Sequence, residues 1–427
     1  MTTPSSGDAP GYLFLAPFDG PGQLGPLIAD DAGEPVWFQD VSGKQVQNFR
    51  VQQFDGNPVL TWWAGVPAPD GTWVGDCLIA DDTYQVVAVL AGARGYQPEN
   101  HEFLITSRDT ALISMNNFVP ADLSAYGGPV AGMVIESVFQ EIDIKSDRLL
   151  LEWHSLDHVA LEESYFPASA AWDYCHLNSI AVDEDDNLVI SCRYPSTIYK
   201  IDRKSGEVIW RLGGKNSDFA MGPGTGFAFQ HDARPHAGNR LTLFDDGAYS
   251  SQSAIESASR GLLLSLDTSA MTCTLELAIP DPDGALSTAM GNVQRLGDGG
   301  YLVGWGTTGT LSEFAADGTL RFAAEIVDQI NYRAFRDLWA GRPTTSPAVA
   351  VVPATDRSLD VYVSWNGATD VASWTVLGGN ELQPLVTVAR TGFETHLHLP
   401  APHPRVLKVA GSDDAGRELG RSALVRI

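Results

Sequence analysis

The chain has 427 residues and a formal net charge of −26, with 27 Lys and Arg residues against 53 Asp and Glu residues. This length permits a large hydrophobic core, in several domains or in one large closed β architecture. No Lys/Arg-rich segment interrupts the negative charge, and such a surface repels polyanions, so we do not expect nucleic acid as a partner.

The N-terminal residues Met1–Asp8 contain neither the cationic stretch nor the apolar core of a signal peptide. The longest apolar runs of the chain are shorter than the ~18 residues that a membrane span needs. We therefore expect no membrane partner and a cytoplasmic location, or a secreted protein if a leader preceded Met1.

Four cysteines are scattered along the chain without a CxxC pair, namely Cys77, Cys175, Cys192 and Cys273. This spacing predicts neither a zinc ribbon nor a disulfide framework, and we expect no metal and no cofactor. Cys175 and Cys192 flank two polar clusters and could be close in space. Burial as small apolar side chains is the favoured interpretation for both.

Residues 1–10 are expected to form a disordered lead. From Gly11 onward, short apolar runs alternate with turns, for example at residues 12–15, 35–38 and 59–63. Helical periodicity is hard to find in any window before about residue 328. The pattern predicts an all-β chain.

A recurring unit consists of a polar cluster, a turn, an apolar strand and further strands that end in Asp or Gly. It is clearest at residues 176–210 and 292–322, and weaker copies begin at His101 and His231. Together with the segments before His101 and between residues 133 and 153, we count six units. Radially repeated four-stranded units are typical of a propeller, so residues 11–347 are predicted to form a six-bladed β-propeller.

The pattern changes after the Pro/Ser/Thr-rich connector at residues 341–347, which follows a possible short helix at 332–340. Short strands with strict alternation follow, for example at 359–367 and 395–399. They predict a small C-terminal β-sandwich of immunoglobulin or fibronectin type over residues 348–427.

Polar residues that begin successive units are the candidate site. His101, His176 with Asn178, and His231 lie 55 to 75 positions apart, and Arg193 ends the strand after His176. Because the innermost strands of a propeller face its central funnel, these side chains are expected to converge there. Imidazole serves as nucleophile or as acid and base, while Arg and Asn bind negative charge, so the set suits an anionic group.

The residues around these positions resemble a known family. The segments that carry the resemblance are His176-Leu177-Asn178-Ser179, Ser191-Cys192-Arg193, residues 198–214, Phe229-Gln230-His231-Asp232-Ala233-Arg234 and Leu243-Phe244-Asp245-Asp246-Gly247. They are similar to the arylsulfotransferases that work without a nucleotide sulfate donor, in the branch common in actinomycetes and fungi, over about residues 11–425. The resemblance implies a six-bladed propeller and ping-pong transfer of a sulfuryl group from a phenolic sulfate ester to a phenol through a sulfohistidine.

The resemblance also implies roles for single residues. His231 matches the sulfated nucleophile, and His176 and Asn178 match the pair that holds the sulfuryl oxygens or the leaving phenolate. Arg193 matches the guanidinium of the pocket, and His101 matches the histidine assigned to acid and base work.

Further residues are expected to complete the pocket. A hydroxyl should come from Ser287 or Thr288, and Gln230 and Asp232 are expected to orient His231. An aromatic or otherwise apolar small molecule is the expected substrate. Its possible lining is aromatic, from Trp172, Tyr174, Tyr194, Phe227, Phe229 and Trp305.

Structural explanations stay open for each of these residues taken singly. A histidine at the start of a strand often bonds the neighbouring blade, Asn178 is a common strand cap, and Arg193 could pair with Asp173 or Asp232. The joint occurrence of these five residues, three His, one Asn and one Arg, is what favours a shared pocket.

The remaining histidines carry weaker signals. His154 and His158 have the spacing of a metal pair, but His-x3-His supports a metal best on a helix and this segment is predicted as strand and loop. His396 and His398 share one strand face, which is expected to be solvated.

Two other functions remain open from the sequence. One is an intracellular tailoring enzyme of natural-product biosynthesis in secondary metabolism, in which the same pocket catalyses cyclisation, rearrangement or hydrolysis by acid and base. The other is a non-catalytic propeller that binds a ligand or a protein, with the sandwich as an interaction module. The oligomeric state, monomer or homo-oligomer, is open as well.

Overall fold

The structure is a computed structural model that describes residues 1–41, 43–69 and 71–427. About 50% of the chain is strand and 3% is helix, so the all-β prediction is confirmed. The helical pieces of the described residues are short 3-10 turns: η1 (Ser124–Tyr126), η2 (Ser155–Asp157), η3 (Leu161–Glu163) and η4 (Gly306–Thr308). No helix in this part of the chain has the length and apolar character needed to cross a bilayer.

Between Tyr12 and Asp337, the described residues form six antiparallel sheets of four strands, two of which gain a fifth strand. The first sheet consists of β28 (Phe335–Asp337), β1 (Tyr12–Leu15), β3 (Leu27–Ala29) and β4 (Pro35–Phe38). The second consists of β5 (Gln45–Phe54), β6 (Asn57–Pro67), β7 (Trp73–Ala80) and β8 (Val86–Leu90). The third consists of β9 (Pro98–Ile105), β10 (Thr110–Ala121), β11 (Gly132–Asp143) and β12 (Arg148–His154), with β13 (Ala171–Asp173) parallel to β11.

The next three sheets follow the chain in the same way. The fourth consists of β14 (Leu177–Val182), β15 (Leu188–Cys192), β16 (Thr197–Ile201) and β17 (Val208–Gly213). The fifth consists of β19 (His231–His236), β20 (Arg240–Asp245), β21 (Arg260–Asp267) and β22 (Thr272–Pro280), with β18 (Ala220–Met221) parallel to β22. The sixth consists of β23 (Asn292–Arg295), β24 (Tyr301–Gly304), β25 (Thr310–Phe314) and β26 (Leu320–Glu325). A small pair, β2 (Pro17–Phe18) and β27 (Ile330–Asn331), lies beside them.

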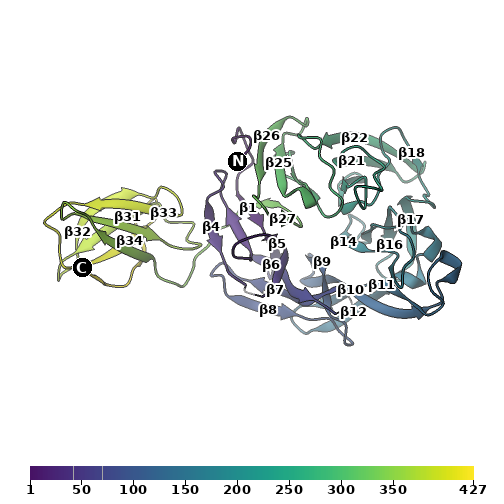
Figure 1. Cartoon of the computed structure of the whole chain (residues 1–427), viewed down its shortest axis with the longest axis horizontal. Helices are drawn as coiled ribbons and strands as arrows, with labels where there is room; N and C mark the ends of the chain where they lie inside the picture. The colour runs from purple at the N-terminus through teal and green to yellow at the C-terminus, as the bar shows by residue number, and fades with distance from the viewer. Residues whose placement is uncertain (42, 70) are drawn as a thin grey trace.

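The six sheets surround a common centre (Figure 1). The first strands of neighbouring sheets contact one another, from β5 to β9, from β9 to β14 and from β14 to β19. The helix expected at residues 332–340 is wrong, because β28 forms there and pairs with β1. Phe335 and Trp339 are buried in the core of the first two sheets, and this packing outweighs any local helical preference.

An asparagine near the start of three innermost strands ties each sheet to the next one. Asn48 donates from Nδ2 to the carbonyl of His101 (2.6 Å), and Asn292 donates to the carbonyl of Ala334 (2.8 Å). Asn178 does the same in β14, with the carbonyl of Gln230 as acceptor (2.8 Å). These bonds satisfy buried backbone groups where the sheets meet.

The C-terminal part forms two further sheets (Figure 1). One consists of β29 (Ala348–Pro353), β30 (Leu359–Ser364) and β33 (Glu394–Leu399), and the other of β31 (Ser373–Gly378), β32 (Gln383–Ala389), β34 (Val406–Ser412), β35 (Glu418–Arg421) and β36 (Val425–Arg426). Buried and more exposed residues alternate along β30 and β33, so their inner faces share one core. The Asn366 side chain bonds the Phe38 backbone at 2.8 and 3.0 Å, which joins this part to the first sheet.

Candidate functional site

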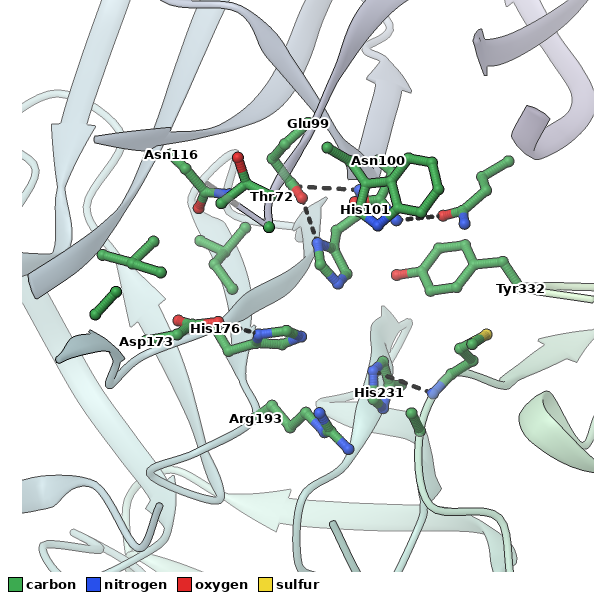
Figure 2. A pocket seen from close by; sticks show the side chains of 18 residues that line it. Thr72, Glu99, Asn100, His101, Asn116, Asp173, His176, Arg193, His231 and Tyr332 are labelled. Atoms are coloured by element: carbon green, nitrogen blue, oxygen red, sulfur yellow. Dashed lines mark hydrogen bonds and ion pairs between the residues drawn. The ribbon is translucent and has the colours of Figure 1, made fainter. Parts of the chain in front are cut away.

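A cavity of about 360 Å³ opens at the starts of the innermost strands (Figure 2). Its chemically active lining residues come from three successive sheets: His101 from β9 of the third, His176 and Arg193 from the segments just before β14 and just after β15 of the fourth, and His231 from the start of β19 of the fifth. Its other lining residues include Gln47, Trp73, Asn100, Asn116, Ile135, Ala171, Leu177, Ala289, Met290 and Tyr332. Residues far apart in the sequence meet here because the sheets point their first strands at one centre.

The three histidines lie within contact distance of each other or of Tyr332. The ring centroids of His101 and His176 are 4.6 Å apart, with an interplanar angle of 75°. The Tyr332 ring lies 5.8 Å from His101 and 6.5 Å from His231. Figure 2 shows all three imidazoles and the Arg193 guanidinium around the same space.

Each of these histidines has its own carboxylate on Nδ1. Glu99 pairs with His101 and Asp173 pairs with His176 in short contacts, and Asp246 Oδ2 lies 2.7 Å from Nδ1 of His231. A carboxylate oxygen accepts a hydrogen bond from a nitrogen that carries a proton. Nδ1 is therefore the donor, and Nε2 is the nitrogen left for chemistry.

His231 is the most deeply buried of the three, with 2% of its side chain exposed against 17% for His101 and 18% for His176. Its Nε2 accepts a bond from the Met290 backbone N–H (3.3 Å), which requires an unprotonated Nε2. Burial, followed by the nearby charge of Arg193, lowers the pKa of His231 well below its ordinary value of 6.5. His231 is therefore neutral at pH 7, with a lone pair on Nε2.

Burial is also the main cause that lowers the pKa of His176 from 6.5, and it outweighs the opposing effect of Asp173. His176 lies against Tyr194, with ring centroids 4.8 Å apart. Its imidazole is also neutral near pH 7, and a neutral imidazole can donate from one nitrogen and accept at the other.

Arg193 is a buried cation that makes no ion pair within the described part of the chain. Its terminal nitrogens donate to the Thr288 carbonyl and to the Tyr194 hydroxyl (3.3 Å), while its Nε–H is buried without a partner. The pairing with Asp173 or Asp232 left open by the sequence does not occur. A buried guanidinium without a counter-ion, at the wall of a cavity, favours an anionic ligand.

Asn178, predicted as a catalytic residue, does not line the cavity. Its side chain is fully buried, Nδ2 donates to the Gln230 carbonyl, and Oδ1 accepts from the Asp232 N–H (3.3 Å). Both ends of the amide are thus used between β14 and β19, as both ends of the Asn292 amide are used on Ala334. The structure gives Asn178 a role in joining sheets.

Gln230 and Asp232 were expected to orient His231, and the structure corrects this expectation. Gln230 Nε2 donates to Ser191 Oγ and to two backbone carbonyls of the fourth sheet. Asp232 pairs with Arg234 (2.6 Å) and Arg333 (3.2 Å). The backbone of Asp232 has a φ of 56°, and the register shifts between His231 and Arg234, so the side chains after His231 turn away from the cavity.

The expected aromatic lining is also corrected in part. Trp172 and Trp305 are buried in hydrophobic cores, where their indole N–H groups donate to Phe166 and Ser312. Thr288 contributes its backbone carbonyl to Arg193, and the Ser287 hydroxyl donates to the Ala289 carbonyl, so neither supplies a hydroxyl to the cavity. Tyr194 lies behind His176 and Arg193, and the aromatic side chains that line the cavity are Trp73 and Tyr332.

The carboxylates were missed by the sequence interpretation. Glu99 and Asp173 lie two and three residues before their histidines, and this short spacing was an available signal. Asp246 follows β20, and it reaches His231 because β19 and β20 pair with His231 opposite Phe244. That contact has no local signature in the sequence.

We compared the sequence of the chain with those of known protein families. The sequence pattern of the family described as Arylsulfotransferase (ASST) matches residues 50–326, a range that contains the three histidines and Arg193. The chain belongs to the arylsulfotransferase family. The resemblance is thereby confirmed at the level of the family, and membership supports an arylsulfotransferase-like function, that of a transferase.

No curated protein matches the chain. Among solved structures, a protein of unknown function from Bacteroides caccae is 11% identical with a TM-score of 0.45, and the match covers 76% of this chain and 98% of that protein. A catalytically inactive virginiamycin B lyase from Staphylococcus aureus with quinupristin is 7% identical with a TM-score of 0.38, covering 84% and 93%. Similarities of this size carry no inference about function.

Proposed function

We propose that this arylsulfotransferase moves a sulfuryl group from a phenolic sulfate ester to a phenol through a sulfated His231. One observation supports it above all. A buried arginine without a counter-ion and a neutral imidazole with a lone pair on Nε2 line the same cavity. A sulfate ester needs a cation for its oxygens and a nucleophile for its sulfur.

In the first half of the reaction, Nε2 of His231 attacks the sulfur atom, a nitrogen–sulfur bond forms, and the bond from sulfur to the phenolic oxygen breaks. The electron pair of that bond leaves with the phenolate. The bond that the Met290 N–H makes to Nε2 is long and therefore weak, so the lone pair can be released to the substrate. Asp246 accepts from Nδ1 and stabilises the positive charge that the ring acquires.

The other groups act on the oxygens. Arg193 neutralises charge on the sulfuryl oxygens and on the departing phenolate, and neutral His176 lies beside it with its Nδ1–H on Asp173 and a lone pair on Nε2. In the second half, an acceptor phenol attacks the sulfur and the nitrogen–sulfur bond breaks. Glu99 pairs with Nδ1 of His101, which leaves Nε2 of His101 to take the acceptor's proton.

We further propose that the six sheets are the blades of one six-bladed β-propeller over residues 11–347, after a lead at residues 1–10. The successive contacts of the first strands, and the pairing of β28 with β1, support this arrangement. Residues 348–427 are then a separate β-sandwich. A small aromatic substrate suits the cavity, whose wall includes Trp73, Ile135 and Leu177.

The test is incubation of the purified chain with 4-nitrophenyl sulfate and a phenol acceptor. We expect release of nitrophenolate, sulfation of the acceptor, and a sulfuryl group on the peptide that contains His231, detected by mass spectrometry. Stable label on another residue, or turnover by His231→Ala equal to that of the unaltered chain, would contradict the assignment of the nucleophile.

A second function is favoured by one specific feature. His101 and His176 each have their own carboxylate, and their rings lie 4.6 Å apart, so this pair can act as acid and base without His231. Cyclisation, rearrangement or hydrolysis of an apolar small molecule would fit such a pair. Folded protein that neither releases nitrophenolate nor acquires a label would move the assignment to this chemistry.

A further inference from the structure

Two buried cysteines lie directly behind the cavity. Cys175 immediately precedes His176, and Cys192 immediately precedes Arg193. The backbones of the two segments are joined, because the Arg193 N–H donates to the His176 carbonyl (3.0 Å) and the Tyr194 N–H donates to the Cys175 carbonyl (3.2 Å). The Sγ atoms of Cys175 and Cys192 are 2.7 Å apart, and both residues are fully buried.

We propose that Cys175 and Cys192 are a disulfide-forming pair that covalently ties the segment holding His176 to the strand end holding Arg193. Their sulfur atoms are closer than the roughly 3.5–4.0 Å at which even the smaller carbon atoms make optimal contact, so two separate thiols are crowded there. A bond between them removes this crowding. The other cysteines, Cys77 and Cys273, lie in the cores of other sheets.

The cross-link would lie next to a residue with an unfavourable backbone conformation. His176 has a φ of 55°, in the left-handed region that residues with a side chain rarely adopt. A covalent bond at the preceding residue restricts the alternatives open to this segment. His176 and Arg193 both line the cavity, so the bond would set the spacing of two groups that face the ligand.

The chemistry is an ordinary thiol–disulfide exchange. The two thiols together lose two protons and two electrons, a sulfur–sulfur bond forms, and a small-molecule disulfide such as oxidised glutathione is reduced to two thiols. Exchange needs a thiolate that can be reached, whereas burial raises the pKa of the Cys192 thiol well above 9.0 in the folded chain. The bond therefore forms while the chain folds and is afterwards sealed from reductants.

The experiment counts thiols and does not depend on the enzymatic activity. The full chain is unfolded with urea and reductant, refolded with oxidised and reduced glutathione, denatured in an alkylating agent, and digested without reduction. A parallel sample is purified without reductant and alkylated directly in denaturant. We expect a cross-linked peptide pair containing Cys175 and Cys192, with Cys77 and Cys273 alkylated as internal controls.

Two further measurements sharpen the result. In the folded oxidised chain, dithiothreitol should leave the cross-link intact until urea is added, and the oxidised form should melt a few degrees above the Cys175→Ser/Cys192→Ser variant. Alkylation of all four cysteines in both samples would overturn the proposal. So would a cross-link involving Cys77 or Cys273, or separate glutathione adducts on Cys175 and Cys192.

Discussion

Histidines paired with carboxylates occur both in the C-terminal sheets and at the cavity, in very different surroundings. In the C-terminal sheets, His396 Nε2 and His398 Nδ1 lie 3.0 and 3.2 Å from the same Asp360 oxygen. Those histidine side chains are 52% and 53% exposed, whereas His231 is 2% exposed and its partner Asp246 is fully buried. The same kind of pair thus exists both in solvent and at the wall of a cavity.

The comparison shows that spacing in the sequence is a poor guide to chemistry. The His-x-His pattern at residues 396–398 is more compact than the spread of His101, His176 and His231 over the chain. Solvent screens the exposed pair and hydrates both partners, so little binding energy is available to a ligand. In the cavity, burial keeps His231 neutral, and Arg193 forms no ion pair with any residue that the structure describes. Both conditions favour binding and attacking an anion.

The largest expected effect is a loss of kcat, and it distinguishes the cavity histidines from the exposed histidines of the C-terminal sheets. His231→Ala should lower kcat for sulfuryl transfer from 4-nitrophenyl sulfate by at least ~10⁴-fold, because the nucleophile is lost. His396→Ala, the matched control on the exposed group, should leave kcat and KM unchanged. Equal losses in both variants, with both proteins folded, would remove the distinction between the two groups.

The second prediction concerns stability near the centre of the sheets. Glu102 is buried next to His101 and pairs with Arg50 (2.9 Å), Arg234 (2.6 Å) and Arg333 (3.3 Å). Burial alone would raise its pKa, but Arg234, Arg333 and Arg50 together lower it to about 2. Glu102→Gln removes a carboxylate that the three buried arginines share and leaves Asp232 to compensate them, so it should lower the free energy of unfolding by about 3–5 kcal/mol.

Urea unfolding at pH 7 measures that loss, with Asp360→Asn as the control in the exposed group. Because the folded pKa of Glu102 is depressed, its stabilisation is present above the ordinary value of 4.5 and is lost as pH falls toward 2. An unchanged unfolding midpoint in Glu102→Gln would contradict this prediction, because it would show that other groups balance the positive charge of the buried arginines.

The third prediction tests the partner of the nucleophile. Burial raises the pKa of Asp246 well above its ordinary value. Asp246→Asn keeps the size of the side chain but removes the ionisable carboxyl group that faces Nδ1 of His231 and can stabilise the ring when it becomes positive. It should lower kcat about 100-fold with little change in KM. Steady-state kinetics with 4-nitrophenyl sulfate measures both constants, and Asp360→Asn serves again as the control. A change confined to KM would mean that Asp246 shapes the cavity and does not assist the chemistry.

The smallest expected effect is the change of kcat/KM and of stability with pH. Because the pKa of His231 is lowered well below 6.5, kcat/KM should be level from pH 8 to 6.5 and should fall only at clearly more acidic pH. The unfolded chain binds this proton more readily than the folded chain. The contribution of His231 to stability is therefore complete above pH 6.5 and is lost as pH falls below it.

Rate profiles and urea midpoints from pH 5 to 8 measure both effects. The slope of stability with pH in the acid range should be smaller in His231→Ala than in the unaltered chain. A rate that already falls between pH 8 and 7 would show that an imidazole of ordinary or raised pKa controls the reaction.

Several features of the fold and the site follow from local patterns. Alternation of apolar and polar residues over short runs predicts strands, because side chains of a strand point to opposite faces. The positions of His101, His176 and His231 at the starts of repeated units placed all three among the candidates. The helix expected at residues 332–340 failed because β28 pairs with β1, more than 300 positions away.

The direction of a side chain at the start of a strand could not be predicted from the local sequence. The register shifts between Leu177 and Ser179, and again between His231 and Arg234. Each bulge interrupts the alternation, so counting residues from a histidine does not tell which neighbour faces the cavity. This is why Asn178 and Asp232 belong to the contacts between sheets, although they lie one or two positions from cavity residues.

The sequence by itself determined the strand class, the family, and the histidines and arginine that meet at the cavity, because these depend on residue types and on repeated local patterns. Only the tertiary structure decided that Asp246 serves His231, that Arg193 forms no ion pair among the described residues, and that Cys175 lies against Cys192. These depend on strand register and on the packing of sheets far apart in the chain. Burial then decides the chemistry, because it lowers the pKa of His231 in the cavity well below its ordinary value.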